Sequence, residues 1–295
     1  MRDTIPAGVR VFGAALRLLP RGRYSLLAAL GPTRGRFVAR LAADLGSARF
    51  HCDLADDIAR ETCLTGYYEP PVTRVFQAHV RHGDVVVDAG ANWGYFTLLA
   101  ASLAGPAGRV LALEPDPRQF AALAANAALN PSAPITPHQA AASSEAGRLT
   151  LSGYRDDDRN RGVSRVGAAR HDGPRFDVAA VTIDDLTASC PAVALVKIDV
   201  EGAEDLALAG MRRGLAEHRY RAVVLELHPE LLEARGVDPA AVMEVLSGHG
   251  YRAAAIDLSP GAYRRAARPG VAVASLLRPA DAWRSMRWPH LLWLC

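Results

Sequence analysis

The sequence predicts an α/β protein built on a doubly wound, Rossmann-like parallel sheet. From Val85 onward, short apolar runs alternate with helical stretches along the chain. The runs are apolar throughout, rather than at every second position, which indicates strands that are buried on both faces. Right-handed crossover connections between such strands place helices on both sides of one sheet.

The expected elements follow one another in a regular order. The strand runs are "VVVDAG", "VLALEP", "ITPHQAAAS", "ALVKIDVEG", "AVVLELHP" and "YRAAAIDL". The helical stretches are "YFTLLAASLAG", "RQFAALAANAAL", "AEDLALAGMRRGLAEH" and "AAVMEVLSGHG". Near the C-terminus, "HLLWLC" is the first candidate for a last strand, and "GVAVASLL" is its competitor.

Two regions stand apart from this pattern. Residues 1–80 are expected to form an N-terminal extension, with "ARFHCDL" as an edge strand and a helix after Pro70, and residues 81–295 the main domain. Within the main domain, residues 147–177 are polar and predict an insertion, either a hairpin with "RLTLSG" as one arm or a mobile loop. Its charge run, Asp156–Asp158, is typical of solvated surface.

Composition limits the class of protein. The formal net charge is only +3, and so weak a basic balance does not favour nucleic acid as a partner, since nucleic-acid binding needs clustered charge. No apolar run approaches the roughly 18 to 20 residues of a membrane span. The four cysteines have no C-x-x-C spacing, so we expect free thiols in a reducing compartment and a cytoplasmic protein. The first 30 residues suit a helical cap, or else a basic amphipathic helix on a membrane or a partner.

A polar, glycine-containing turn follows the first strong strand. It reads "DAGANWG" and lies where ligands bind in doubly wound folds, beyond the carboxyl end of the strand. Gly90 and Gly94 are expected to let the backbone approach a ligand closely, and Asn92 tolerates left-handed dihedral angles. A helix starting at about Tyr95 would direct its amide groups at the turn.

The turn fits a dinucleotide poorly. In the G-x-G-x-x-G fingerprint counted from Gly90, the second glycine position holds Asn92 and the third holds Tyr95. A carboxylate at Asp88 would repel a pyrophosphate but suits an ammonium group, which it would contact directly or through water. S-adenosylmethionine has an amino-acid end, a ribose and no phosphate, so this cofactor is the better match.

Glu114 supplies the second half of the expected cofactor site. It ends the next strand run, 20 positions after Gly94, where an acidic residue commonly holds a ribose diol. A carboxylate accepts hydrogen bonds from both hydroxyls at once. The cofactor-binding set is therefore predicted to be Asp88, Gly90, Asn92, Gly94, Tyr95 and Glu114.

Together these motifs resemble the FkbM-type S-adenosylmethionine-dependent methyltransferases. The similarity rests on "VVVDAGANWGYFTLLAA", "VLALEPDP", "VTIDDL", "VKIDVEGAE" and "VVLELHPE", and it covers roughly residues 60 to 258. The resemblance implies a class I methyltransferase sheet of seven strands, the last antiparallel, and O-methylation of sugars or natural products in secondary metabolism. The long N-terminal part and the C-terminal "WRSMRWPHLLWLC" depart from the family pattern.

The candidates for catalysis stand at the ends of the fourth and fifth strands. Lys197 and Asp199 share one side of a strand by alternation, as do Glu226 and His228. An alcohol acceptor must lose a proton, and the ordinary pKa of histidine suits a general base at neutral pH. Lys197, the chain's only lysine, is expected either to pair with Asp199 or to act directly.

Other readings of the same residues remain open. Asp199, Glu226 and His228 could gather a divalent ion, but no spacing requires one, and we predict no metal. The expected partner is a small-molecule hydroxyl acceptor, recognised by the N-terminal extension, residues 147–177 and the C-terminal tail, in a chain that can form a homo-oligomer. The alternatives are an NAD(P)-dependent oxidoreductase and a non-catalytic relative that binds the cofactor.

Overall fold

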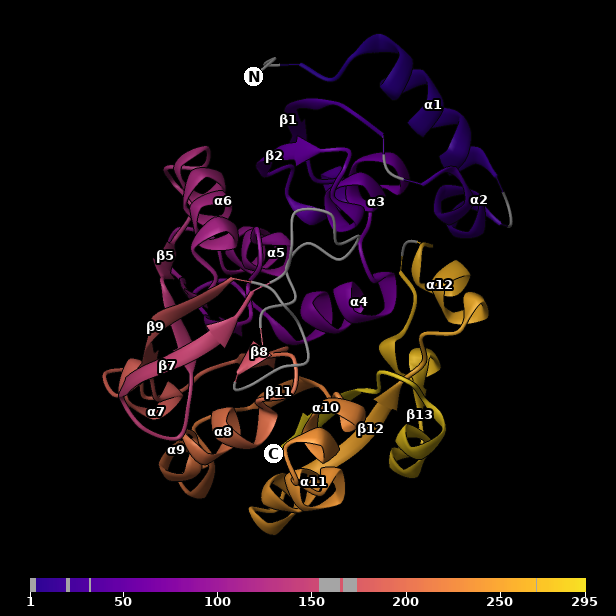
Figure 1. Ribbon diagram of the computed structural model, residues 1–295. Coiled ribbons are helices and arrows are strands. Elements are labelled where there is room, and N and C mark those ends of the chain that lie inside the picture. The colour runs from indigo at the N-terminus through magenta and orange to yellow at the C-terminus, as the bar shows by residue number, and fades with distance from the viewer. Residues whose placement is uncertain (1–3, 20–21, 32, 154–164, 167–173, 269) are drawn as a thin grey trace.

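The largest sheet has eight strands in the order β13-β12-β14-β11-β10-β3-β4-β5. The computed structural model describes residues 4–19, 22–31, 33–153, 165–166, 174–268 and 270–295 (Figure 1). The strands of this sheet are β3 (Val85–Ala89), β4 (Arg109–Leu113), β5 (Ile135–His138), β10 (Leu195–Ile198), β11 (Ala222–Glu226), β12 (Arg252–Ile256), β13 (Leu277–Arg278) and β14 (His290–Leu294).

The strand directions confirm the predicted doubly wound fold. Neighbouring strands from β5 to β11 are parallel, whereas β14 is antiparallel to both β11 and β12. The strand order reverses between β3 and β10, and ligands in such sheets bind beyond the carboxyl ends at that switch point. Seven strands and an antiparallel last strand were expected; the two-residue β13 adds an eighth at the edge.

The C-terminal strand was identified correctly from the sequence. "HLLWLC" forms β14, while its competitor "GVAVASLL" contributes the short helix η2 (Val273–Leu276) and the start of β13. The run "ITPHQAAAS" was expected to be one strand but divides into β5 and β6 (Ala140–Ala142). The reason is pairing: β5 extends the large sheet beside β4, and β6 pairs with another sheet.

Helices cover both faces of the large sheet. The α-helices of the described residues are α1 (Ala7–Leu18), α2 (Arg23–Leu30), α3 (Asp57–Thr65), α4 (Pro70–His79), α5 (Tyr95–Ala104), α6 (Pro117–Ala128), α7 (Ile183–Leu186), α8 (Glu204–Ala209), α9 (Arg212–Ala216), α10 (Pro229–Ala234), α11 (Pro239–Gly248) and α12 (Pro260–Ala266). Several begin with an Asp-Pro or Ser-Pro pair, in which the side chain caps the helix and proline takes the first turn.

Successive strand residues enter two separate apolar layers. Val86 and Val110 belong to the layer that contains α4 and α5, and Val87 and Leu111 belong to the layer that contains α8, α9, α10 and α11. All four valine and leucine side chains have no exposed surface. The continuous apolar runs therefore reflect burial on both faces, as the sequence predicted.

One predicted helix is interrupted. The stretch "AEDLALAGMRRGLAEH" forms α8 and α9, which are separated at Gly210. A Cβ atom at Gly210 would lie 2.1 Å from the carbonyl oxygen of Ser143, so the chain approaches another backbone segment here. The close approach requires glycine, and glycine weakens a helix.

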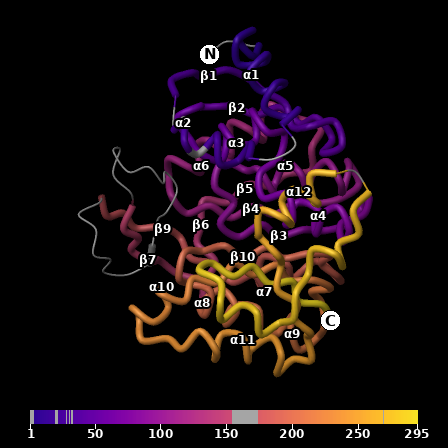
Figure 2. The backbone as a smooth tube through the Cα atoms, turned by 90° about the vertical axis from the view of Figure 1, so that its right-hand side faces the viewer, coloured from indigo at the N-terminus to yellow at the C-terminus, as the bar shows by residue number. Residues whose placement is uncertain are grey.

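The N-terminal segment forms its own small sheet and helices. β1 (Arg36–Arg40) and β2 (Arg49–Asp53) are antiparallel to each other and are not part of the large sheet, so "ARFHCDL" is not an edge strand of that sheet. In both views these elements lie at one end of the molecule and α11 lies at the other (Figure 1, Figure 2). Arg17 of α1 donates to the carbonyl groups of Cys63 and Leu64 at the end of α3.

Part of the polar region 147–177 forms a hairpin. Its arms are β7 (Gly147–Ser152) and β9 (Arg175–Val181), which pair antiparallel in a sheet of order β6-β9-β7-β8, with β8 at Arg165–Val166. "RLTLSG" is thus one arm, as predicted. The charge run Asp156–Asp158 lies outside the described residues. Among the described helices, none has the length and apolar character needed to cross a membrane.

Asn126 joins the N-terminal sheet to the glycine turn. Its side-chain oxygen accepts from the amide of His51 in β2 at 2.7 Å, and its side-chain nitrogen donates to the carbonyl of Trp93 at 2.8 Å. Asn130, one helical turn later in the chain, makes a similar pair of bonds with Arg49. Asn126 is buried, whereas Asn130 is only half-buried.

We expect Asn126→Ala to lower the free energy of unfolding by about 2–4 kcal/mol, because two buried backbone groups lose their partners at roughly 1–3 kcal/mol each. Urea denaturation followed by circular dichroism measures this change. Asn130→Ala is the matched control and should cost less, since water reaches the groups it frees. Equal losses in the two variants would show that burial of Asn126 is not what stabilises this junction.

Candidate active site

The turn after β3 holds three residues in left-handed backbone conformations. The φ angles are +81° at Gly90, +53° at Asn92 and +100° at Gly94. The amides of Gly90 and Ala91 both donate to the carbonyl of Leu113, each at 2.9 Å, which fastens the turn to the end of β4. Asn92 stabilises its own conformation, because its side-chain oxygen accepts from the next amide at 2.7 Å.

The two glycines are needed for a different reason from the one predicted. A Cβ atom at Gly90 would lie 1.7 Å from the carbonyl oxygen of Asp199, and one at Gly94 would lie 2.8 Å from the Leu123 side chain. At both positions the backbone closely approaches the protein's own chain, which leaves no space for a side chain. Gly90 lines the pocket beside the turn, whereas Gly94 does not and instead caps α5.

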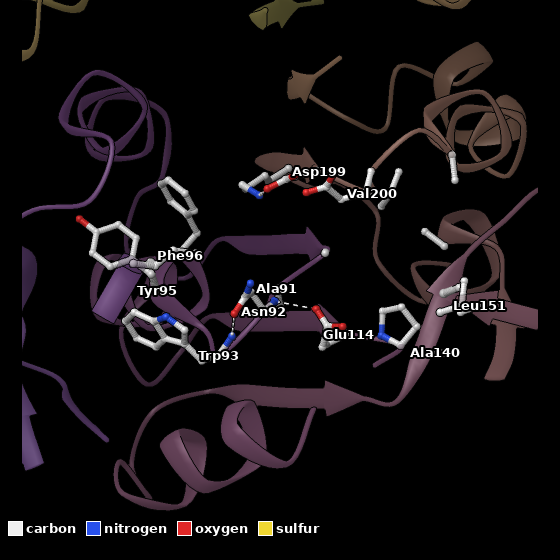
Figure 3. Close-up of a pocket in the computed structure, with 18 of the residues that line it drawn as sticks. Ala91, Asn92, Trp93, Tyr95, Phe96, Glu114, Ala140, Leu151, Asp199 and Val200 are labelled. Atoms are coloured by element: carbon white, nitrogen blue, oxygen red, sulfur yellow. Dashed lines mark hydrogen bonds and ion pairs between the residues drawn. The ribbon is translucent and has the colours of Figure 1, made fainter. Parts of the chain in front are cut away.

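Glu114 lies at the edge of the sheet, directly after β4, and faces the pocket. One carboxylate oxygen accepts from the amide of Asn92 at 2.8 Å and the other from the amide of Asp116 at 2.9 Å. Figure 3 shows Glu114 on the opposite side of the pocket from Asp199. Burial raises the pKa of Glu114 to about 8, against the effect of these two backbone bonds. The structure thus places this carboxylate where the sequence predicted it.

Asp88 does not line the pocket, which corrects the sequence prediction. Its side chain has no exposed surface, and one of its oxygens accepts from the hydroxyl of Thr97 at 2.6 Å. Burial raises its pKa, while the charge of Lys197 opposes that shift. In this conformation the carboxylate is bonded to Thr97 near the start of α5, and it cannot contact the ammonium group of a cofactor directly.

Aromatic side chains close one wall of the pocket. Trp93 stacks on Phe50 with ring centroids 5.1 Å apart and planes inclined by 18°. Tyr95, which was expected to contribute its backbone, lines the pocket, and its hydroxyl lies 2.9 Å from that of Thr73. Figure 3 shows that this hydroxyl points away from Glu114. Both aromatic residues are buried and hold the turn rigid.

Lys197 and Asp199 form a buried ion pair, 2.9 Å from Nζ to Oδ2. Burial opposes the charge of Lys197, but the carboxylates of Asp199 and Asp88 outweigh it and raise its pKa. Burial would raise the pKa of Asp199, but Lys197 and then His228 bring it below its usual range. Lys197 thus has the first of its two predicted roles, the pairing with Asp199, and its charge favours the ionised form of that carboxylate.

The contacts of His228 differ from those expected of the predicted general base. Its Nδ1 atom lies 2.8 Å from Oε1 of Glu204, and its Nε2 atom lies 3.5 Å from Glu201 and 3.6 Å from Glu226. Burial would lower the pKa of His228, but the bond to Glu204 and the charge of Glu201 raise it to about 9. This arrangement favours the protonated imidazole at neutral pH, which argues against the predicted role of His228 as general base.

Glu226 has a second histidine beside it that the sequence reasoning missed. His290 is the antiparallel partner of Glu226 in the register of β11 and β14, and its Nε2 atom lies 3.0 Å from Oε2 of Glu226. Burial, and after it the charge of Asp199, raises the pKa of Glu226. Placing "HLLWLC" antiparallel beside "VVLEL" would have revealed this pair.

Two adjoining cavities lie at this edge of the sheet. The first is narrow, about 80 Å³, and is lined by Glu114, Asn92 and the aromatic wall. The second is about 740 Å³ and is lined by Glu226, His228 and His290 together with parts of the N-terminal segment and the C-terminal tail. Both are lined by Ile58, Tyr68, Asn92, Asp199 and Glu201.

The residues of the first cavity suit the cofactor predicted from the sequence. Glu114 offers a carboxylate at one side, and Gly90 and Asn92 of the left-handed turn line the cavity beside it. Pockets for ligands of this size are roughly 300–1,000 Å³. A nucleoside with an amino-acid chain would therefore extend from the narrow cavity toward the larger one, past Asp199.

Comparisons with known proteins agree with this site. The family described as "Methyltransferase FkbM domain" matches residues 88–253. The protein "31-O-demethyl-FK506 methyltransferase FkbM" of Streptomyces tacrolimicus is 34% identical over 202 residues, which cover 58% of this chain and 74% of that protein.

Solved structures show weaker similarity. A putative rRNA-methylase from Clostridium thermocellum is 14% identical and covers 76% of this chain and 92% of its own, with a TM-score of 0.44. Fibrillarin from Aeropyrum pernix, with natively bound S-adenosyl-L-methionine, is 13% identical and covers 74% of this chain and 68% of its own, with a TM-score of 0.41. We infer no function from these two.

The family match covers more than half of the chain, including the glycine turn, Glu114 and the ends of β10 and β11. The FkbM relative is similar over most of its own length. The chain belongs to the FkbM family of S-adenosylmethionine-dependent methyltransferases.

Proposed function

We propose that the protein methylates a hydroxyl oxygen of a small molecule, a sugar or another natural product. The observation that carries this proposal is the cavity of about 740 Å³ that adjoins the narrow cofactor pocket and shares Asp199 with it. A cavity of that size accepts a small organic molecule. The name of the Streptomyces relative, a 31-O-demethyl-FK506 methyltransferase, supports a hydroxyl of a secondary metabolite as acceptor.

The cofactor-binding roles follow from the first cavity. S-adenosylmethionine supplies a methyl group that is already activated on a sulfonium sulfur. Glu114 would accept hydrogen bonds from the ribose hydroxyls, since each oxygen retains a lone pair after bonding to one backbone amide. Asn92, Gly90 and Tyr95 would shape the pocket around the rest of the cofactor.

Asp199 is the best-placed residue on the acceptor side. It lies between the two cavities, and Lys197 holds its Oδ2 atom. An ionised carboxylate here would accept a hydrogen bond from the acceptor hydroxyl and orient its oxygen for in-line attack on the methyl group. Alignment of this kind is the main contribution of a protein to such a displacement.

The lining of the larger cavity favours a neutral, hydroxylated acceptor. Its carboxylates include Asp56, Glu61, Glu69 and Glu226, and only a few cationic side chains offset them. Such a surface would repel phosphate, so nucleic acid is a poor acceptor. Because residues before 80 and the tail around Trp288 both contribute, we propose that the N-terminal extension and the C-terminus select the acceptor.

The four cysteines suit a cytoplasmic location. Cys52, Cys63 and Cys190 are buried free thiols, and Cys295 is an exposed one. Free thiols persist in reducing compartments.

The wild-type protein should bind S-adenosylmethionine and S-adenosylhomocysteine, and not NAD, in titration calorimetry. It should also add the mass of one methylene unit to hydroxylated acceptors screened by mass spectrometry. Cofactor binding without any methylated product across sugar and polyketide-like panels would favour the non-catalytic alternative. A preference for NAD would contradict the cofactor assignment.

Glu114 should make cofactor affinity depend on pH. Its pKa of about 8 lies above the usual value, so the free protein holds a proton there at neutral pH. Binding that needs the ionised carboxylate should strengthen by up to about tenfold per pH unit between about 7 and 8 and level off above. In Glu114→Gln this rise should vanish, and affinity at pH 9 should fall by about 1.5–3 kcal/mol.

Glu145→Gln, at an exposed carboxylate away from the pocket, is the control and should keep the wild-type profile. A pH-dependent rise in the Glu114→Gln variant would assign the titration to another group.

Asp199→Asn should lower kcat by about 100-fold, the scale of losing one positioned polar group in the transition state. The affinity for S-adenosylhomocysteine should change far less, because Glu114 would remain to hold the nucleoside. Asp205→Asn, in the same segment but paired with Arg235, serves as the control and should retain most of the turnover. Full turnover in Asp199→Asn would place hydroxyl alignment elsewhere.

A further inference from the structure

The larger cavity contains a group of three donors that no step above requires. Glu69 precedes α4, Glu226 ends β11 and His290 begins β14, so three distant segments meet here. Their donor atoms all lie within 4.8 Å of one another. His290 Nε2 is 3.0 Å from Oε2 of Glu226 and 3.5 Å from Oε2 of Glu69.

The orientation of His290 is fixed by its other ring nitrogen. Nδ1 lies 3.1 Å from the carbonyl oxygen of Trp288, which can only accept, so Nδ1 carries a hydrogen. Histidines that bind metals are typically oriented in this way, with one nitrogen donating to a carbonyl or carboxylate and the other facing the ion.

The facing nitrogen of His290 lacks a hydrogen-bond partner. The residue is only 2% exposed, and Nε2 makes no hydrogen bond despite its short approach to Glu226. The Nε2 atom and the two carboxylates converge on one point, and this arrangement requires a positive charge between them, either a proton on the imidazole or a bound metal ion. A metal ion would supply that charge and use all three donors at once.

We propose that Glu69, Glu226 and His290 form a binding site for a divalent first-row metal ion. Two carboxylate oxygens and one imidazole nitrogen suit ions such as Mn²⁺, which accept both oxygen and nitrogen donors. All three residues line the larger cavity, so the remaining coordination positions face the acceptor side. If the proposed methyl transfer holds, the ion would bind an acceptor with two adjacent oxygen atoms, such as a vicinal diol.

A second group shares Glu226 but is less suited to an ion. It consists of Asp199, Glu226 and His228, whose donor atoms also lie within 4.8 Å of one another. The carboxylate of Asp199 is already held by the ammonium group of Lys197 at 2.9 Å. A dication at Asp199 would lie beside that fixed positive charge, whereas no lysine or arginine is paired with Glu69 or Glu226 among the described ion pairs.

The test is a Mn²⁺ titration of the full chain after treatment with a chelator, followed by electron paramagnetic resonance of the free ion. The wild-type protein should bind about one Mn²⁺ per chain. His290→Gln and Glu69→Gln should each weaken that binding by at least about tenfold. Glu230→Gln, which changes an exposed carboxylate of the same cavity, is the control and should bind Mn²⁺ as the wild type does.

Absence of Mn²⁺ binding to the wild type, or equal binding in all variants, would overturn the proposal. It would also be overturned if His228→Gln and Asp199→Asn lost the ion while His290→Gln and Glu69→Gln kept it. S-adenosylhomocysteine affinity and thermal unfolding, measured on the same samples, report whether each variant is folded. Because Mn²⁺ binding is measured without acceptor, the metal site and the methyl-transfer function can fail independently.

Discussion

A buried ammonium group organises the functional edge of this protein. Lys197 is only 3% exposed, and it lies directly opposite Asp88 in the register of β10 and β3 while its Nζ atom contacts Asp199. Ionised groups in the interior are tolerated only when they are paired and hydrogen-bonded. Without Lys197, the buried carboxylate of Asp88 and the half-buried one of Asp199 would lie near one another with no cation between them, at the point where the strand order reverses. The sheet edge therefore depends on this single cation.

The same pairing explains why lysine appears in a chain that otherwise uses arginine. The ammonium group is compact and its three donors can be satisfied between neighbouring strands, and it also lies 5.2 Å from the centre of the Phe96 ring. A guanidinium group has five donors in a rigid plane and needs more space and more acceptors. The use of lysine rather than arginine at position 197 therefore has a steric and an electrostatic cause.

The sequence was sufficient to predict the sheet and the place of Glu114 at its edge, but not the direction of every side chain. Glu114 follows the last residue of β4, so its side chain is free to turn toward the edge. Asp88 lies within β3, where alternation directs it under α5 toward Thr97. Glu114 and Asp88 are both acidic residues near the end of a strand. They differ because Glu114 follows the last paired residue of its strand, whereas Asp88 lies within its strand.

Charge states were harder to predict, because they depend on residues that are distant in sequence. The pKa of His228 is raised by Glu204, Glu201 and Glu226, which come from the start of α8, the turn before it and the end of β11. His290 reaches Glu226 only because β14 inserts antiparallel between β11 and β12. Local sequence spacing predicts an ordinary pKa for His228, whereas in the folded chain carboxylates from distant segments surround this side chain.

The segment "DVEGAE" combines these effects in one turn. The backbone of Asp199 donates to Ala89 at 3.0 Å, and its carbonyl leaves no space for a side chain at Gly90. Gly202 has a φ angle of +91°, and an added Cβ there would lie 2.5 Å from Leu231. Glu204, with no exposed surface, accepts from the amide of Gly202 and holds the Nδ1 atom of His228.

The acids and the glycine of this turn therefore have separate tasks. Asp199 contacts both the turn at Gly90, through its backbone, and Lys197, through its side chain. Gly202 permits the reversal of the chain, and Glu204 orients His228 through the Nδ1 atom. Asp199 and Glu201 each line both cavities, so the turn forms part of the wall between them. One short backbone segment therefore shapes both the proposed cofactor site and the proposed acceptor site.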